Sequence, residues 1–179
     1  FVTGATPGQI ASIDTQMIGR EFLTWLWFKS EERNGMISIP DRGDVEASFV
    51  RRVVLESGEG DYAETVVCSG LHAGLNEGRE ALRRGKKIKE ARIRLGKDTE
   101  QWEFTFKADR FQIQSLKLPV MPEAEDNEQD RDGRILERIY LLETALSTME
   151  ELFTLFLKTR FSPGWDTDEK ARMNKWIEK

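Results

Sequence analysis

The sequence predicts an α+β fold in which an antiparallel β-hairpin and a three-stranded meander pack with a Trp-rich N-terminal helix and a long C-terminal helix. Three observations carry this prediction: two β-rich segments flank a loop of turn residues, a later run alternates apolar and polar residues, and two segments show helical apolar spacing. The chain has 179 residues, with ten Phe and five Trp. This is enough to build a core without disulfides or metals.

The N-terminal part is expected to contain a buried helix and a hairpin. Residues 14–33 repeat apolar residues at helical spacing, and Trp27 and Phe28 widen the apolar face. We therefore expect a helix that is buried on more than one side. Its aromatic residues could stack on nucleic-acid bases, but their apolar neighbours favour core packing. Segments 45–56 and 62–69 are rich in β-forming residues and predict the hairpin.

A short helix and the meander follow the hairpin. Residues 75–84 are amphipathic, and Gly85 can cap this helix in the left-handed conformation. Two turns divide residues 89–118 into three alternating segments, which predicts an antiparallel meander with one face in a core. Ile88 falls out of phase, so the first strand is expected to start near Lys89. The third strand alternates less cleanly, and the pattern leaves its inward face open.

The C-terminal third is expected to be helical after an acidic linker. Residues 119–133 hold six acidic residues and no periodic apolar pattern. From Ile135 to Phe156 apolar residues recur at alternating spacings of four and three, which predicts a long helix with a heptad-like stripe. Asp166 and Glu169 suggest a capping box for a last helix. The expected division is an α+β region at 1–118, a linker at 119–133 and a helical region at 134–179.

One strongly basic segment stands out from the net charge of -5. Residues 78–97 carry nine basic residues against two glutamates, a net charge of +7, so the rest of the chain sums to -12. Several of these cations could share one surface and neutralise DNA phosphates without reading bases. The alternative is a solvated face that balances the acidic residues at 123–132, and the sequence leaves both open. The cations of this segment expected to contact DNA are Arg79, Arg83, Arg84, Lys86, Lys87, Lys89, Arg92 and Arg94.

Catalytic chemistry has little support in the sequence. Cys68 and His72 are the single cysteine and histidine, so neither a disulfide framework nor a Cys/His zinc site can form from them alone. Cys68 is expected to be a buried small residue, and His72 a loop residue. A nuclease would need converging carboxylates to hold Mg²⁺, and no spacing singles out Glu103 or any other acidic residue. We therefore expect no enzyme activity, no cofactor and no metal.

The order of features resembles a known family. The order begins with the segment GREFLTWLWFKSEE, a hairpin and a short helix that ends in Gly85-Lys86. The strands RIRL, WEFTF and IQSLKLP, an acidic linker and a long helix follow. This order is similar to the C-terminal half of RdgC, a family of bacterial recombination-associated proteins. The resemblance is clearest from about Leu75 to Leu157. It implies an α+β homodimeric ring that encircles double-stranded DNA without sequence preference and restrains RecA-mediated recombination. It carries the basic residue of the family's Gly-Lys pair onto Lys86, and it adds Lys117 to the expected DNA contacts.

The sequence thus predicts a non-enzymatic protein that binds double-stranded DNA, forms a homodimer and affects a RecA-type recombinase indirectly. We expect a cytoplasmic, nucleoid-associated location and no membrane contact. The chain starts at Phe1 and is expected to be the interior of a longer protein, with an N-terminal half preceding it. Two alternatives remain: a protein-interaction or dimerisation module built on the 135–156 stripe, and a nuclease.

Overall fold

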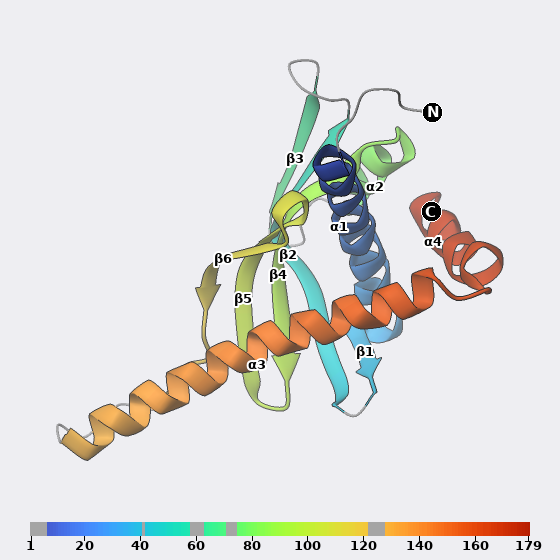
Figure 1. The fold of residues 1–179 in the computed structure, drawn as a ribbon. Helices are drawn as coiled ribbons and strands as arrows, with labels where there is room; N and C mark the ends of the chain where they lie inside the picture. The colour runs from blue at the N-terminus through green and yellow to red at the C-terminus, as the bar shows by residue number, and fades with distance from the viewer. Residues whose placement is uncertain (1–6, 41, 58–62, 71–74, 122–127) are drawn as a thin grey trace.

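The computed structural model describes residues 7–40, 42–57, 63–70, 75–121 and 128–179, and it confirms an α+β fold (Figure 1). Short 3₁₀ turns at Arg33–Gly35 and Ala108–Arg110 and a π-helical turn at Trp165–Glu169 join some of the elements. The helices and strands, in chain order, are α1 (Pro7–Glu31), β1 (Met36–Ile39), β2 (Gly43–Ser57), β3 (Glu64–Gly70), α2 (Leu75–Arg83), β4 (Lys87–Lys97), β5 (Glu100–Lys107), β6 (Gln112–Lys117), α3 (Glu128–Arg160) and α4 (Lys170–Ile177).

The six strands in the described part of the chain belong to one antiparallel sheet. Its order is β1-β2-β4-β5-β6, and β3 also pairs with β2. The long strand β2 carries β1 along residues 43–46 and β3 along residues 51–57, and its other edge pairs with β4. The predicted hairpin and meander are both present, and the β2–β4 pairing joins them.

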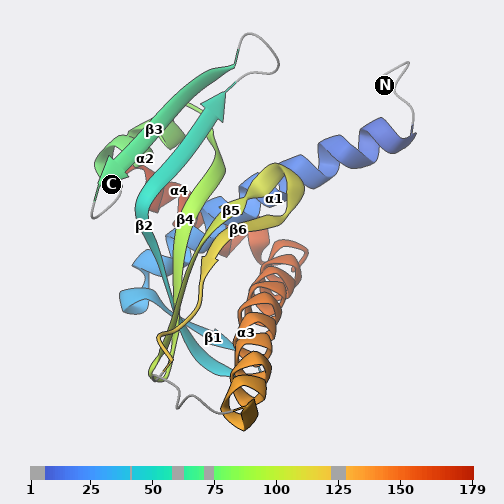
Figure 2. The same ribbon diagram turned by 90° about the vertical axis from the view of Figure 1, so that its left-hand side faces the viewer.

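The helices cover one face of this sheet. Figure 2 shows α1 and α3 on the same side of the strands. The strands send alternate side chains toward these helices, as a half-buried antiparallel sheet requires. The inward set on β4 and β5 consists of Ala91, Ile93, Leu95, Trp102, Phe104 and Phe106, all buried in one core cluster.

Helix α1 lies at the centre of the core. Every residue from 22 to 28 is buried, as expected for a helix covered on more than one side. Phe22 meets Phe106 of the sheet and Phe153 of α3, with ring centroids 5.9 and 5.3 Å apart. Trp27 stacks on Phe49 of β2 at 5.5 Å and meets Trp176 of α4 edge-on at 5.6 Å. The sheet, α3 and α4 therefore enclose α1 from three sides.

Two details of the strands differ from the sequence expectation. Strand β4 begins at Lys87, and Ile88 is fully buried because a register shift between Val54 and Leu55 adds a residue to β4. In β6, Ser115 has a φ of 52°, and the ladder shifts beside it. Ile113 and Leu116 therefore both pack on the core despite their odd spacing.

Two expectations for the C-terminal third are also corrected. Helix α3 begins at Glu128, inside the predicted linker 119–133, and residues 122–127 lie outside the described part. The capping box is wrong. The Glu169 carboxylate is buried, where it accepts a hydrogen bond from Trp25 Nε1 at 2.9 Å and pairs with Lys29 Nζ at 2.6 Å. Burial of the indole required an acceptor, and Glu169 supplies it.

Gly19 sets how closely α1 approaches the sheet. A Cβ at this position would lie 2.2 Å from the carbonyl oxygen of Ala108, a backbone atom that cannot move aside alone. We expect Gly19→Ala to lower the free energy of unfolding by about 2 kcal/mol or more. The measurement is urea unfolding followed by tryptophan fluorescence.

The matched control is Gly133→Ala in α3, where an added Cβ meets nothing within 4 Å. There the loss of backbone freedom in the unfolded chain should raise stability by about 0.5–1 kcal/mol. Equal effects of the two substitutions would contradict the close packing of α1 described above.

Candidate nucleic-acid interface

The predicted cations of α2 lie on the helix-covered side of the sheet. Arg83 and Arg84 each pair with Glu80 at 3.0 Å, and Arg83 Nε also donates to the carbonyl oxygen of Ile177 in α4 at 2.9 Å. Arg79 donates to Asn76 Oδ1 at 3.3 Å. Much of the charge at the end of α2 is therefore offset by its own helix.

The next three cations surround the start of β4. Lys86 is only 7% exposed, and its Nζ donates to Ser57 Oγ at 3.1 Å and to Glu64 Oε2 at 2.9 Å. Lys89 pairs with Glu56 at 2.9 Å, and the side chain of Lys87 is exposed and makes no hydrogen bond or ion pair with another described residue. Lys86 and Lys89 thus fasten the ends of neighbouring strands.

Arg92, Arg94 and Lys117 occupy a different surface, the sheet face that no described helix covers. Arg92 and Arg94 alternate with the inward residues of β4, and Lys117 pairs in register with Glu103, which also points outward. The structure therefore divides the nine predicted residues, because strand alternation sends β4 arginines to the face opposite α2. We call this exposed surface the open face.

Sequence reasoning missed three further cations on the open face: Arg51, Arg52 and Lys107. Phe49 pairs with Ile93 and Val53 with Ala91, so three residues of β2 lie opposite the single residue Arg92. This irregularity lets two successive arginines point the same way, which regular alternation forbids. Arg51 has a φ of 63° and lies 3.7 Å from Glu103, and Arg52 lies 3.5 Å from Glu90. The consecutive pair Arg51-Arg52 was the signal in the sequence.

Glu103 lies at the centre of the open face and is 9% exposed. Its carboxylate accepts a hydrogen bond from Arg92 Nε at 3.0 Å and another from Arg94 at 3.4 Å. Burial by itself would raise the pKa of Glu103, but the Arg92 hydrogen bond and the charges of Arg51 and Arg92 outweigh it and hold the pKa below its ordinary value. Glu103 therefore stays ionised and orients the arginines around it.

The open face is basic and lacks aromatic rings. Among the residues that the structure describes, its acidic members are Asp44, Glu46, Glu90 and Glu103, fewer than its basic ones. The outward uncharged residues of β5 and β6 include Gln101, Thr105, Gln112 and Gln114. Every described aromatic residue of the strands is turned to the core. The open face can therefore bind anions, but it offers no ring for base stacking.

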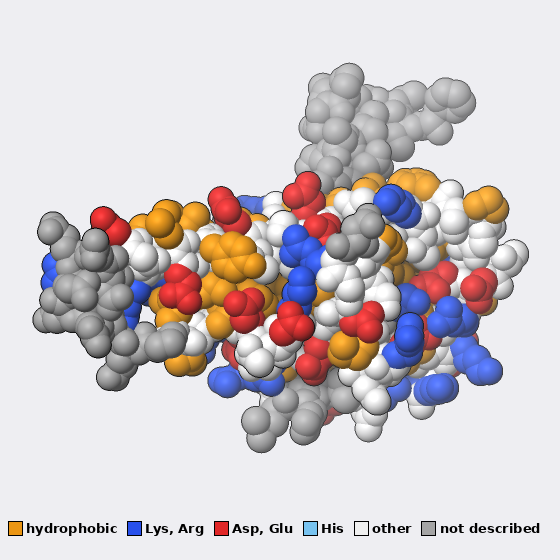
Figure 3. All heavy atoms as spheres, turned by 90° about the horizontal axis from the view of Figure 1, so that it is seen from below, with side chains coloured by type: hydrophobic (Ala, Val, Ile, Leu, Met, Phe, Trp, Pro, Cys, Tyr) orange, Lys and Arg blue, Asp and Glu red, His pale blue; other side chains and the backbone are white. Residues whose placement is uncertain are grey.

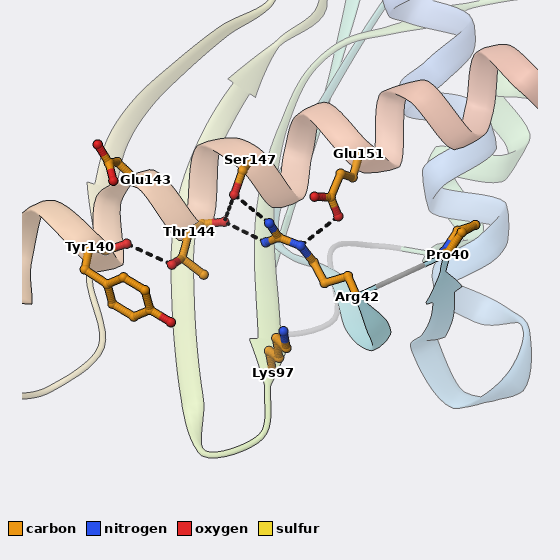
Figure 4. A pocket seen from close by; sticks show the side chains of 8 residues that line it. All are labelled: Pro40, Arg42, Lys97, Tyr140, Glu143, Thr144, Ser147 and Glu151. Carbon is orange, nitrogen blue, oxygen red and sulfur yellow. Dashed lines mark hydrogen bonds and ion pairs between the residues drawn. The ribbon is translucent and has the colours of Figure 1, made fainter.

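A hollow of about 580 Å³ between α3 and the turn after β1 is the other candidate site (Figure 4). Arg42 projects into it, but its guanidinium donates to Thr148 Oγ1 at 2.6 Å and to Ser147 Oγ at 2.9 Å. The same group pairs with Glu151 at 2.7 Å. These contacts fasten the segment after β1 to α3, so the guanidinium of Arg42 is already engaged within the protein.

Other candidate chemical groups do not form a site in the described residues. Cys68 is fully buried, as expected, and burial raises the pKa of its thiol. His72 lies outside the described residues. Within the described ranges no three Asp, Glu, Cys or His side chains are grouped to hold a metal ion, and no helix is long and apolar enough to cross a membrane.

The charge of Glu103 should contribute to stability in a pH-dependent way. Glu103→Gln leaves Arg92 and Arg94 without their carboxylate, so we expect the free energy of unfolding at pH 7 to fall by about 1–2 kcal/mol. Because the folded-state pKa is lowered, the native contribution is complete above the unfolded pKa and is lost as the pH falls through the folded pKa. The difference in the free energy of unfolding between the native protein and the variant should therefore become smaller below roughly pH 4.

Urea unfolding between pH 7 and pH 3 measures this difference in the free energy of unfolding. Glu100→Gln on the same strand is the control, because Glu100 has no ion pair with another described residue. A difference that is absent at pH 7, or that widens as the pH falls, would contradict the role of Glu103.

Comparison with known proteins gives no family for this chain. No protein-family model, curated protein or solved structure matches it. The resemblance to RdgC accordingly stays a prediction from the sequence, and the open face is defined by this structure alone.

Proposed function

We propose that the chain binds double-stranded DNA without sequence preference and that the open face is the contact surface. The observation that carries the proposal is the gathering of six basic side chains on one uncovered sheet face, with Arg51 added to Arg52 by the irregularity in β2. Arg92, Arg94 and Lys117 were expected to contact DNA from the sequence. Arg51, Arg52 and Lys107 join them.

The geometry of the open face suits a phosphate backbone. The six cations are spread over β2, β4, β5 and β6, a width of about 14 Å at the usual strand spacing. A duplex carries one negative charge per about 1.7 Å of its axis, so several phosphates fall within that width. Arg51 and Arg52 are more than half exposed, so their guanidinium groups can exchange weak surface pairs for phosphate contacts.

The lack of rings on the open face favours a duplex over a single strand. Proteins that hold single strands without sequence preference rely on aromatic side chains on which successive bases stack. Contacts to phosphates alone fix position without reading sequence. The proposal therefore includes binding that depends strongly on salt and little on base composition.

The resemblance to RdgC extends this proposal. It adds a homodimeric ring around the duplex and an indirect effect on a RecA-type recombinase in the nucleoid. These remain predictions from the sequence, and the open face supports only the DNA contact within them.

Two variants with the same change of charge test the proposed surface. The open-face variant combines Arg51→Gln, Arg52→Gln and Lys107→Gln, and the control combines Arg79→Gln, Arg83→Gln and Arg84→Gln at α2 and its C-terminal end. We expect the open-face variant to bind a duplex at least roughly tenfold more weakly at low salt and to lower the salt-dependence slope by about three. The control should keep most of the native affinity for the duplex and most of the native salt-dependence slope, because α2 lies on the other face of the sheet.

Fluorescence anisotropy with a labelled duplex across a salt series measures both quantities. Circular dichroism and thermal unfolding check that both variants are folded. Equal losses in the two variants would show that net charge rather than the open face governs binding, and no loss in either would overturn the proposal.

A further inference from the structure

The first turns of α3 carry apolar side chains that nothing in the described part of the chain covers. Residues 131–140 include no buried side chain, whereas Leu141 and Ala145 are buried against the body. Figure 1 shows this half of α3 running out past the sheet, and Figure 3 shows hydrophobic side chains along it. The large exposed apolar residues of α3 are Ile135, Leu136, Ile139, Tyr140, Leu142 and Leu146.

The predicted stripe at 135–156 therefore divides into two halves. Met149 and Phe156 are buried in the core, while the four preceding stripe positions keep the same spacing but face solvent. A helical segment shorter than about 12 to 15 residues is marginal in water unless another surface packs on it. The exposed half thus has the heptad spacing of a coiled-coil strand without a partner.

We propose that the exposed stripe pairs with the same stripe of a second copy of this chain, with the two α3 helices parallel and in register. Ile139 and Leu142 then occupy successive a and d positions, and a β-branched residue at a with Leu at d favours two parallel strands. Ile135 occupies the preceding d position and Leu146 the following a position, so they lengthen the contact while the preference for two strands rests on the central pair. The proposal does not depend on DNA binding.

Charges beside the stripe favour a second copy and set the direction of pairing. Arg138 comes just before the a position, and Glu143 just after the d position, and both are exposed without an ion pair to another described residue. In a parallel pair, Arg138 of each copy lies beside Glu143 of the other, which gives two symmetric ion pairs. An antiparallel pair would not bring these two residues together.

The position of the stripe leaves room for this partner. Successive residues of a helix are separated by about 100°, so the stripe lies roughly a third of a turn from the face that Leu141 and Ala145 pack on the body. A second helix can lie along the stripe without displacing the sheet. A two-fold axis parallel to α3 then places the two bodies on opposite sides of the helix pair.

Sedimentation equilibrium of the chain, without DNA, tests whether the stripe associates. We expect a reversible dimer, and we expect Ile139→Asp with Leu142→Asp to weaken it by roughly a hundredfold or more. Phe161→Asp is the control, because Phe161 is also apolar and even more exposed, lies just past the other end of α3 and should leave the dimer intact. The substituted residues are exposed, so circular dichroism should show folded variants.

Charge reversal tests the role of Arg138 and Glu143, the charged residues beside the stripe. Arg138→Glu should weaken the dimer, and combining it with Glu143→Arg should restore it, because the two residues then meet with exchanged signs. A monomer at all concentrations, or a dimer that none of these substitutions changes, would overturn the proposal.

Single cysteines test the direction of pairing. Ile135→Cys and Leu146→Cys should each form a disulfide-linked dimer alone under mild oxidation, since each residue meets itself in a parallel pair. The native protein is the control, because its Cys68 is buried. Cross-linking only when the two variants are mixed would show antiparallel pairing and would overturn the parallel arrangement.

Discussion

The burial of seven consecutive residues in α1, at 22–28, is the constraint on which the rest of the structure depends. A helix that is apolar all round must be covered all round, and one sheet face cannot do this alone. Phe153 and Phe156 of α3 cover one flank, and Trp176 of α4 covers another. The hydrogen bond from Trp25 to Glu169 satisfies the indole Nε1, which would otherwise be buried without a hydrogen-bond partner. The helices that the structure describes are thereby gathered on one face of the sheet.

The open face follows from the same constraint. Once the helices are gathered around α1, the outward residues of β2, β4, β5 and β6 have only solvent and one another as neighbours. Arginines tolerate this arrangement because Glu103 accepts hydrogen bonds from both Arg92 and Arg94, and Arg92 also donates to Thr105 and Ser115. Most of the acidic residues that the structure describes lie elsewhere, so a protein of net charge -5 can present a basic surface.

Much of the fold could be predicted because the spacing of apolar residues along the chain indicates which side chains of a helix or strand are buried. The spacing in α1 and α3, the alternation of β4 and β5 and the left-handed Gly85 all follow from local patterns, and the structure confirms them. The pairing of β2 with β4 could not be predicted, since it joins segments distant in sequence. The residues of the open face could be predicted only in part: alternation separates Arg92 from Arg84, and the irregularity that turns Arg51 outward beside Arg52 has no local pattern.

Arginine footprinting tests the central claim most directly. Arg51 and Arg84 are both well exposed, at 62% and 73% of their side chains, so an arginine-specific reagent such as phenylglyoxal should modify both in the protein alone. With saturating duplex DNA, mass spectrometry should show protection of Arg51, Arg52 and Arg94, with Arg84 still reactive. Protection of Arg84 while the arginines of the open face keep reacting would contradict this account.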